Sequence, residues 1–333
     1  MKAMILCAGL GTRLRPFTER WPKPAMPFLG APLFRYHLEV LRAAGVQAVG
    51  INTHHLPDVM AETARAECER LGLPLHVVHE PVIQGTGGGI RGLRRFLEGG
   101  DFIVFNGDIL FPVDLGPVVA AHRASGAAAT MVLMPMPEGE RYASVDLDAG
   151  GRVRRIAGLG PGGEGLTPWH FTGVHVMSPR VFDFMSPEGP EDINREVYVR
   201  MMAAGVPVRG EAVRAYWSDL GTPSRYLGTV RDVLAGRVSV DRLGPRGTGN
   251  YWVHPTARVL GQVTGPAHFD AGCVVEPGAR VGASVSVGPR VRVGARARLE
   301  RVALLEGTEV APDEELVDVV AWGPHRVPAP LGA

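Results

Sequence analysis

Residues 2–16 read KAMILCAGLGTRLRP, a short apolar run followed at once by glycines and arginines. An apolar run of this length that ends in glycine is typical of the first strand and turn of a strand–helix–strand unit. Glycines there let the backbone approach a phosphate, and the N–H groups that follow can bind an anion. The stretch is neither a phosphate loop nor a dinucleotide fingerprint, because Leu14 stands where the third glycine of the fingerprint belongs. Taken alone, it is equally compatible with a tight turn that binds no ligand.

Strand and helix signals alternate through the first 125 residues. The predicted strands are 3–7, 48–52, 75–78 and 102–105, and the predicted helices are 32–44, 57–71, 88–97 and 115–125. This pattern predicts a parallel sheet covered by helices, with ligands at the carboxyl ends of the strands. Further strands are predicted at 130–134, 144–147, 153–156, 171–176 and 212–217. We expect this second group to extend the same sheet.

An internal repeat follows residue 250. Apolar residues recur at intervals of six, at Val263, Phe269, Val275, Val281, Val287, Val293, Leu299 and Leu305. This period fits a parallel β-helix of hexapeptide repeats and neither an α-helix nor an ordinary strand pair. Val253 and Val259 are out of phase, which predicts a slip near Gly265. With a glycine-rich boundary at 244–249, we expect one domain over 1–240, the β-helix over 250–322 and a tail over 323–333.

Composition excludes several classes of protein. A chain of 333 residues, 45% of them hydrophobic, can build two domains. The net charge of +1 gives no overall attraction to nucleic acid or to an anionic membrane. The longest apolar stretch, 127–136, is about half of a membrane span, and the N-terminal apolar run is too short for a signal peptide. Three distant cysteines indicate neither a disulfide framework nor a zinc site. We therefore expect a cytoplasmic protein.

Four charged residues stand out by position. Lys23 is one of only two lysines, between Pro22 and Pro24, and it adds a compact cation close to Arg13 of the glycine turn. Asp108 and Asp219 each follow a predicted strand. Carboxylates at that edge of a sheet can bind Mg²⁺ together with substrate phosphates, although a surface aspartate that caps a helix is the alternative. Together the four residues indicate phosphoryl or nucleotidyl transfer.

These motifs, taken jointly, resemble one enzyme family. GLGTRLRP at 9–16, PKP at 22–24, NGD at 106–108 and WSDLGTP at 217–223 are similar to the sugar-1-phosphate nucleotidyltransferases, and the type is closest to mannose-1-phosphate guanylyltransferases. The resemblance covers about residues 1–235 and implies a Rossmann-like α/β domain with a mixed, mainly parallel sheet. The hexapeptide tail is similar to the short left-handed β-helix of many members. The implied reaction transfers a nucleotidyl group from an NTP to a sugar-1-phosphate, giving an NDP-sugar and pyrophosphate.

The resemblance also implies roles for individual residues. Arg13 would hold the β and γ phosphates and the departing pyrophosphate, Lys23 would contact the phosphates at the reacting centre, and Asp108 and Asp219 would bind Mg²⁺. The sugar-phosphate oxygen would attack the α-phosphorus in line, without a covalent enzyme intermediate. The expected substrate-binding residues are Leu6, Ala8, Gly9, Gly11, Thr12, Glu80, Gly85, Thr86, Gly107, Tyr142, Thr172 and Gly173.

The base and the sugar are harder to assign. Glu80 lies five residues before Gly85, in the segment that reads the base in this family. A carboxylate accepts hydrogen bonds only, which suits the N1–H and 2-amino groups of guanine. We therefore expect GTP with mannose-1-phosphate or a related sugar. The glycine run 85–89 also resembles that of heptose-1-phosphate guanylyltransferases and N-acetylmuramate-1-phosphate uridylyltransferases, so a uridylyltransferase for an N-acetylated sugar is the alternative. An exposed Glu80 without a ligand is a further possibility.

One family motif is missing. Gly151-Arg152-Val153 is present, but the Glu-Lys-Pro that should follow is not, so Arg154 or Arg155 would have to replace the lysine. This gap leaves open a non-catalytic regulatory subunit that binds NDP-sugar. The intact charged motifs argue against that alternative.

The predicted β-helix carries a row of arginines. Arg290, Arg292, Arg296 and Arg298 alternate on outward positions, where we expect a solvated face or a subunit contact rather than a phosphate site. We expect the β-helix to serve in packing or in forming a homo-oligomer.

Overall fold

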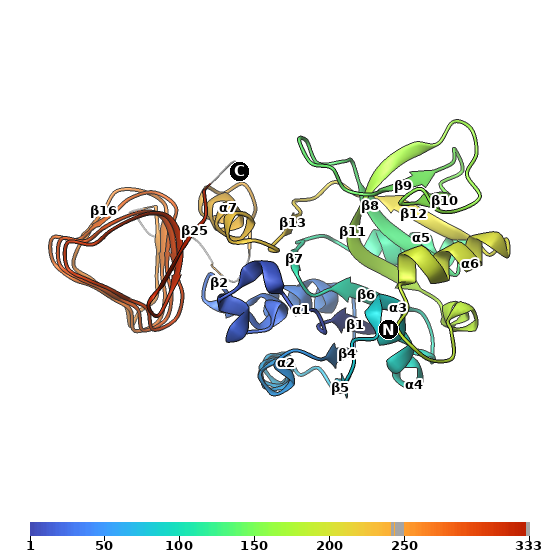
Figure 1. The fold of residues 1–333 in the computed structure, drawn as a ribbon, viewed down its shortest axis with the longest axis horizontal. Coiled ribbons are helices and arrows are strands. Elements are labelled where there is room, and N and C mark those ends of the chain that lie inside the picture. The colour runs from blue at the N-terminus through green and yellow to red at the C-terminus, as the bar shows by residue number, and fades with distance from the viewer. Residues whose placement is uncertain (241–242, 244–249, 331–333) are drawn as a thin grey trace. The chain divides into compact units, whose positions relative to one another are not determined.

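The computed structural model describes residues 1–240, 243 and 250–330 and contains two compact units (Figure 1). The first unit consists of Met1–Leu10, Pro22–Ala25 and Phe34–Trp217, and the second of Gly11–Trp21, Met26–Leu33 and Ser218–Ala333. The glycine turn is therefore divided, with Gly9 in the first unit and Gly11 in the second. The predicted boundary at 244–249 lies outside the described residues, and the predicted domain limits remain a prediction.

A nine-stranded sheet forms the centre of the first unit. Its strands are β1 (Lys2–Leu6), β4 (Ala48–Thr53), β5 (Leu75–His79), β6 (Phe102–Asn106), β8 (Ala129–Met134), β9 (Ser144–Leu147), β10 (Val153–Ile156), β11 (Thr167–Met177) and β12 (Val208–Ala212). β1 runs parallel to β4 and β6, and β4 runs parallel to β5. The direction reverses at β11, which is antiparallel to β6, β8 and β9. The predicted mixed, mainly parallel sheet is confirmed.

Helices cover this sheet. They are α1 (Leu33–Ala43), α2 (Pro57–Leu71), α3 (Gly85–Gly92), α4 (Arg94–Leu97), α5 (Gly116–Ser125) and α6 (Tyr198–Ala203), with shorter turns at η3 (Lys23–Ala25), η4 (Pro179–Phe184) and η5 (Ile193–Val197). α2 packs on β4 and β5, while α5 packs on β8 and β11. Pro57 at the start of α2 and Gly72 in the left-handed region at its end explain why the sequence predicts this helix so well. No helix in the described parts of the chain is long and apolar enough to cross a membrane.

Two predicted elements differ from the observed ones. The helix expected at 88–97 begins earlier, at Gly85, and is split into α3 and α4. The strand expected at 212–217 is wrong, because β12 spans Val208–Ala212 and pairs with β8. Gly210 lies in the middle of β12, where glycine weakens the strand signal in the sequence. The structure explains it, because a Cβ at Gly210 would lie 2.5 Å from Leu133 Cδ1.

The second unit contains the hairpin β2 (Pro27–Phe28) and β3 (Ala31–Pro32), helix α7 (Pro223–Leu234) and a parallel β-helix. Two turns, η1 (Thr12–Leu14) and η2 (Phe17–Glu19), and two short strands, β7 (Ile109–Leu110) of the first unit and β13 (Ser218–Asp219) of the second, complete the elements before residue 240. The strands of the β-helix are β14 (Trp252–Val253), β15 (Arg258–Val259), β16 (Gln262–Val263), β17 (Ala267–Phe269), β18 (Val274–Val275), β19 (Arg280–Val281), β20 (Val285–Val287), β21 (Arg292–Val293), β22 (Arg298–Leu304), β23 (Glu309–Val310), β24 (Glu315–Trp322) and β25 (His325–Pro328).

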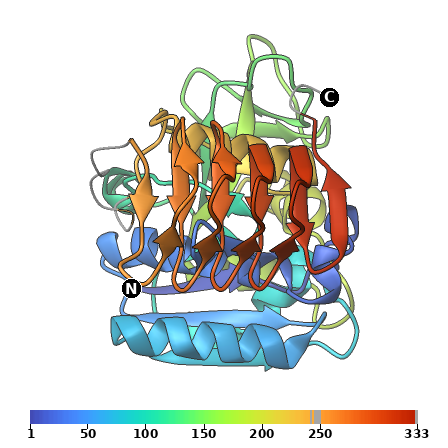
Figure 2. The same cartoon turned by 90° about the vertical axis from the view of Figure 1, so that its left-hand side faces the viewer.

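The hexapeptide repeat produces the coils of the β-helix. Gln262 pairs with Arg280, and Arg280 with Arg298, so one coil takes 18 residues, or three repeats. Successive coils stack their strands in register (Figure 2), and the view along the axis shows a triangular section (Figure 1). The repeat residues Val275 and Val281 are fully buried inside the triangle. The predicted parallel β-helix is confirmed.

Two coils are shorter than the repeat predicts. The first slip falls between Val259, which pairs 16 residues ahead with Val275, and Val263, which pairs 18 ahead with Val281. It therefore lies before Gly265 and includes Gly261. In the fourth coil Leu304, rather than the predicted Leu305, pairs with Val287. The chain there saves one residue at a corner where Arg301 adopts a positive φ.

The arginine row is exposed, and three of its four members, Arg290, Arg292 and Arg296, are paired. Arg296 donates to Asp313 on the next coil at 2.7 and 2.6 Å, and Arg290 forms an ion pair with Glu306. Arg292 lies 3.9 Å from Glu276 on the preceding coil. Pairs this exposed contribute little to stability, but they neutralise most of the row and leave it a poor site for a phosphate.

Two histidines are fully buried in the first unit. The Nε2–H of His37 donates to the carbonyl oxygen of Ile109 at 2.7 Å, and burial lowers the pKa of His37 to about 4. His175 shares a 2.8 Å hydrogen bond with the hydroxyl of Tyr198, and burial lowers the pKa of His175 to about 3. Both rings are neutral in the folded protein near neutral pH.

We predict that stability falls as the pH drops below about 6.5, the ordinary histidine pKa. Below it the unfolded chain binds protons that the folded chain does not, so protonation favours unfolding. Between about pH 7.5 and about pH 5 each histidine should cost about 2 kcal/mol of unfolding free energy. His37→Gln can still donate to Ile109. Measured by urea unfolding at about pH 7.5 and about pH 5, its loss of unfolding free energy between the two pH values should be smaller than the parent's by about 2 kcal/mol.

The control is His79→Gln, which changes an exposed ring of the same unit. It should retain the pH dependence of the parent protein. A His37→Gln protein with the parent's full pH dependence would contradict the assignment.

Candidate active site

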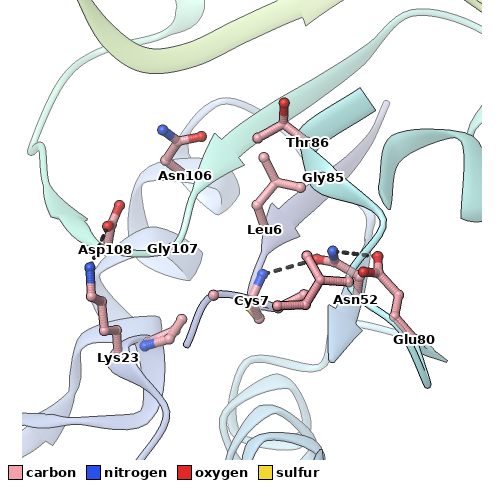
Figure 3. Close-up of a pocket in the computed structure, with 14 residues that line it drawn as sticks. Leu6, Cys7, Lys23, Asn52, Glu80, Gly85, Thr86, Asn106, Gly107 and Asp108 are labelled. Carbon is pink, nitrogen blue, oxygen red and sulfur yellow. Dashed lines mark hydrogen bonds and ion pairs between the residues drawn. The ribbon is translucent and has the colours of Figure 1, made fainter. Parts of the chain in front are cut away.

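A cavity of about 290 Å³ opens at the carboxyl ends of β1, β4 and β6 (Figure 3). These strands are parallel and adjacent, so the segments that follow them meet at one edge of the sheet. The lining residues are Leu6, Cys7, Ala8, Gly9, Lys23, Pro24, Asn52, Glu80, Ile83, Gly85, Thr86, Asn106, Gly107 and Asp108. The structure therefore brings together most of the nucleoside-side residues predicted from the sequence.

Lys23 and Asp108 form the charged wall of the cavity. Lys23 Nζ lies 3.0 Å from Asp108 Oδ2, and the exposed fractions of the two side chains are 14% and 36%. Gly107 sets this geometry, because its N–H donates to Leu6 O at 3.1 Å and a Cβ there would lie 2.7 Å from Pro24 Cγ. The turn after β6 can therefore pack against the Pro22–Pro24 turn only with glycine at this position. The result is a cation and a carboxylate side by side at the carboxyl end of β1.

The opposite wall is built around a buried carboxylate. Glu80 is 5% exposed, and its Oε1 accepts from Asn52 Nδ2 at 2.8 Å. Asn52 Oδ1 in turn accepts the backbone N–H of Cys7 at 2.9 Å, while Glu80 Oε2 accepts the N–H of Gln84 at 3.0 Å. A hydrogen-bonded chain thus joins Glu80 to the glycine turn (Figure 3). The alternative of an exposed Glu80 is wrong.

The glycines of α3 are required by close packing. A Cβ at Gly89 would lie 2.7 Å from Asn52 Nδ2 on one side of the helix, and a Cβ at Gly85 would lie 2.5 Å from the carbonyl oxygen of Glu191 on another. Gly85 also has a φ of +69°, which disfavours other residues. The helix is therefore wedged between the Asn52–Glu80 pair and the backbone of Glu191.

Glu191 holds the start of α3 through its backbone. Its carbonyl oxygen accepts the N–H groups of Gly87 at 2.8 Å and Gly88 at 3.3 Å, which have no partner within the first turn of a helix. These two donors are therefore used by the protein itself. The glycine run 85–89 acts as a packed wall rather than as a phosphate-binding loop.

The side chain of Glu191 anchors the loop that contains Glu191 itself. Glu191 is 3% exposed, and its Oε1 accepts from Ser186 N at 3.0 Å and Oγ at 2.7 Å and forms an ion pair with Arg200. Burial raises the pKa of Glu191, but the Ser186 hydrogen bonds and the Arg200 guanidinium outweigh burial and hold that pKa below its ordinary value. Thr86 Oγ1 adds a further link by accepting Ile193 N–H at 2.9 Å.

Cys7 lines the cavity but is not a nucleophile. Burial, followed by the nearby Asp108 carboxylate, raises the pKa of the Cys7 thiol well above its ordinary value. A thiol that stays protonated does not attack phosphorus. The cavity thus has no thiolate for covalent catalysis at Cys7, which agrees with a direct displacement.

The remaining charged candidates belong to the second unit. A Cβ at Gly221 would lie 2.8 Å from Arg13 Nη2, so the Arg13 guanidinium lies against the loop that carries Asp219. Asp219 forms an ion pair with Arg225 of α7. Gly11, with a φ of +66°, precedes the turn that contains Thr12 and Arg13. Arg13 and the Asp219 loop are thus adjacent.

The expected sugar-side residues lie on or near the antiparallel part of the sheet. The ring of Tyr142 packs at 4.4 Å from His170 and at 5.6 Å from Trp217. Trp217 Nε1 donates to Thr172 O at 2.8 Å, and the Thr172 hydroxyl donates to a backbone carbonyl of β8. The hydroxyl hydrogen of Thr172 is therefore used in a hydrogen bond within the sheet.

Gly173 packs closely against a residue of the cavity wall. A Cβ at Gly173 would lie 2.8 Å from Nδ2 of Asn106, which lines the cavity. The arginines considered as replacements for the missing lysine are engaged within the neighbouring hairpin. Arg155 Nε bonds Asp146 at 3.0 Å, and Arg154 Nε bonds Gly162 O at 3.1 Å.

Asn52, Ile83 and Asn106 also line the cavity and are absent from the predicted set. Asn52 and Asn106 had a usable signal, because each is a polar residue near the end of an apolar strand. Glu191 had none, since its role depends on a contact 104 residues away, between its carbonyl oxygen and Gly87.

The donor set suits a hard cation in part. Among the described residues no group of three or more His, Cys, Asp or Glu could form a complete metal site. Mg²⁺ commonly uses one or two carboxylates and completes its shell with substrate phosphates and water. Asp108 fits this requirement, since its carboxylate is partly exposed at the cavity wall.

Comparison with known proteins identifies the family. The family model described as nucleotidyl transferase matches residues 2–236. A mannose-1-phosphate guanylyltransferase of Mycobacterium tuberculosis is 32% identical over 288 residues, which cover 85% of this chain and 79% of the relative. The chain belongs to the nucleotidyl transferase family.

Two further proteins are similar to most of the chain. A UTP–glucose-1-phosphate uridylyltransferase of Synechocystis is 27% identical over 346 residues, which cover 98% of this chain and 88% of the relative. The solved structure of HddC from Yersinia pseudotuberculosis, complexed with GMP-PN, has the same fold over 68% of this chain and 96% of that one, with a TM-score of 0.56 and 23% identity. This nucleotidyltransferase makes an NDP-sugar from an NTP and a sugar-1-phosphate.

The wedge around α3 of this nucleotidyltransferase gives a stability prediction. Replacing glycine by alanine within a helix ordinarily stabilises a protein by up to about 1 kcal/mol. Gly89→Ala should instead destabilise it by about 1–3 kcal/mol, because the new Cβ would lie 2.7 Å from Nδ2 of the buried Asn52. Urea unfolding measures the difference.

Gly92→Ala is the matched control on the same helix. Its Cβ would have ordinary contact only, 3.8 Å from Val78 Cγ1, so this variant should be as stable as the parent or more so. Equal effects of the two substitutions would show that α3 is not wedged.

Proposed function

We propose that this nucleotidyltransferase is a guanylyltransferase that joins GTP to mannose-1-phosphate or a closely related sugar-1-phosphate. The observation that carries the proposal is the buried Glu80 carboxylate on the cavity wall, held by Asn52 and by the N–H of Gln84. A carboxylate has about four lone-pair positions, and two of them are used by these donors. Those that remain suit the N1–H and 2-amino group of guanine, whereas uracil has only one N–H.

The relatives support the same choice of substrates. Mannose-1-phosphate guanylyltransferases of Mycobacterium tuberculosis and of rice are 32% and 30% identical to this chain. These similarities favour guanine and mannose, while Glu80 supplies the physical reason for the base.

The proposed reaction is a direct displacement at the α-phosphorus. An ionised oxygen of the sugar-1-phosphate forms the new P–O bond while the bond to the β-phosphate oxygen breaks, and pyrophosphate leaves with its negative charge. No proton has to be removed from the nucleophile. Lys23 lies at the cavity wall beside the glycine turn, where its cation would neutralise the phosphates at the reacting centre.

The other charged residues would act on the leaving group. Arg13, with its planar fork of donors, suits the β and γ phosphates and the pyrophosphate. Asp108 and Asp219 would hold Mg²⁺, which neutralises phosphate charge and orients the triphosphate when bound. The pairing of Lys23 with Asp108 keeps both side chains at the cavity wall until substrate phosphates compete for Lys23.

A uridylyltransferase for glucose-1-phosphate is the second candidate. It is favoured by the relative from Synechocystis, whose similarity covers 98% of this chain. The two candidates differ in the base, and Glu80 is the residue that separates them.

Pyrophosphate release with Mg²⁺ tests the proposal. GTP, UTP, dTTP, ATP and CTP are each combined with mannose-, glucose-, N-acetylglucosamine-, N-acetylmuramate- and heptose-1-phosphate. We expect the fastest release with GTP and mannose-1-phosphate or a related sugar. Release with UTP or dTTP alone would overturn the base assignment. No release, from protein that still binds an NDP-sugar, would favour a regulatory subunit.

Glu80→Gln should lower the preference for GTP. The substitution removes the charge and replaces one acceptor by a donor that faces the guanine N–H groups. We expect kcat/KM with GTP to fall by about 10–100-fold, while kcat/KM with UTP falls less. The control Glu62→Gln makes the same chemical change at an exposed site on α2. It should match the parent, and an unchanged GTP preference in Glu80→Gln would contradict the role of Glu80.

A further inference from the structure

The turn that carries Arg13 is internally fixed. The N–H of Leu14 donates to Gly11 O at 2.9 Å, and the buried hydroxyl of Thr18 donates to the same oxygen at 2.9 Å. The N–H of Trp21 donates to Phe17 O at 3.1 Å, which closes the segment at its far end. These hydrogen bonds link Trp21, through Phe17 and Thr18, to the turn that carries Arg13.

Trp21 contacts the end of the β-helix. Its ring is 9% exposed and lies edge-on to the ring of Trp322, with centroids 5.2 Å apart. Trp322 is the last residue of β24 and pairs with His325 across an antiparallel hairpin, β24–β25, that departs from the parallel coils. The ring of His325 stacks on Trp322 at 5.6 Å. The hairpin therefore offers an aromatic surface to the segment that carries Arg13.

A second set of contacts, through helix α7, connects the β-helix to Arg13. Helix α7 packs on β22, β24 and β25. The hydroxyl of Tyr226, on this helix, donates to Pro27 O at 2.6 Å. The loop just before α7 contains Gly221, against which the Arg13 guanidinium lies. The coils and the hairpin thus hold Arg13 both from its own segment and from the loop that it contacts.

A close approach near the second coil adds to this arrangement. Gly30, between β2 and β3, has a φ of +79°, and a Cβ there would lie 2.1 Å from Asp270 Oδ2. Asp270 directly follows β17 and is 9% exposed. The N-terminal hairpin therefore packs on the β-helix at a point where no side chain fits.

We propose that the β-helix is a scaffold for the pyrophosphate-binding arginine, and that Trp322 is a positioning residue for Arg13. The inference rests on the proposed role of Arg13 in holding the β and γ phosphates. It gives the β-helix a function within its own chain, in addition to any part in oligomer formation. Trp322 itself touches no substrate in this account and acts through Trp21.

Binding of two probes tests this proposal. Inorganic pyrophosphate with Mg²⁺ reports on the Arg13 side, and GMP, which lacks the β and γ phosphates, reports on the nucleoside cavity. By isothermal titration of the full chain, Trp322→Ala should weaken pyrophosphate binding by about tenfold, since small displacements of a binding group cost this much or more. GMP binding should remain within about twofold of the parent. Trp322→Phe, which keeps a ring edge, should restore pyrophosphate binding.

Two further variants serve as references. Arg13→Ala removes the proposed ligand group and should weaken pyrophosphate binding by at least about tenfold. Trp252→Ala makes the same substitution as Trp322→Ala in the first coil of the β-helix and should leave pyrophosphate binding unchanged. Trp322→Leu keeps apolar volume without the ring, and it provides the same test if the alanine variant does not fold.

The outcomes separate this inference from the proposed function. Loss of pyrophosphate binding in Arg13→Ala, with none in the Trp322 variants, would overturn the positioning role and leave the role of Arg13 intact. Unchanged binding in Arg13→Ala would overturn both. Equal weakening of GMP and pyrophosphate in Trp322→Ala would indicate general loss of structure and would also overturn the positioning role.

Discussion

Helix α3 has no room for a side chain at Gly85, Gly88 and Gly89, and this constraint shapes the cavity. The Asn52–Glu80 pair occupies one side of the helix and the backbone of Glu191 another. Because α3 packs tightly against the Asn52–Glu80 pair, Glu80 is held on the cavity wall, and Asn52 links it to the N–H of Cys7. The cavity wall that carries Glu80 is therefore fixed by contacts within the protein, which is the arrangement that favours selective binding.

The four charged residues assigned to the reaction come from different units. Lys23 and Asp108 belong with the nucleoside cavity in the first unit, whereas Arg13 and Asp219 belong with the β-helix in the second. The division falls inside the glycine turn, between Gly9 and Gly11. The short stretch 2–16 thus supplies both the first strand of the sheet and the arginine that would receive the leaving group. In the proposed reaction these four residues act by charge neutralisation and positioning rather than by covalent chemistry.

The elements that could be predicted from the sequence are those with signals in neighbouring residues. Pro57 and Gly72 mark the ends of α2, and the six-residue apolar period predicts the β-helix, because both features depend on neighbours in the chain. Leu305 was misplaced in the repeat, since one residue is saved at the Arg301 corner and no local signal shows it. The role of Glu191 was missed for a related reason, because it arises from packing between segments far apart in sequence.

The binding of modified guanine nucleotides tests the central claim most directly. Isothermal titration with GTP, inosine triphosphate and N1-methyl-GTP removes the 2-amino group and the N1–H one at a time. The account predicts that each modified nucleotide binds at least about tenfold more weakly than GTP, because each loses a hydrogen bond to the Glu80 carboxylate. Equal affinity for all three, with equal affinity for UTP, would show that Glu80 does not read the base.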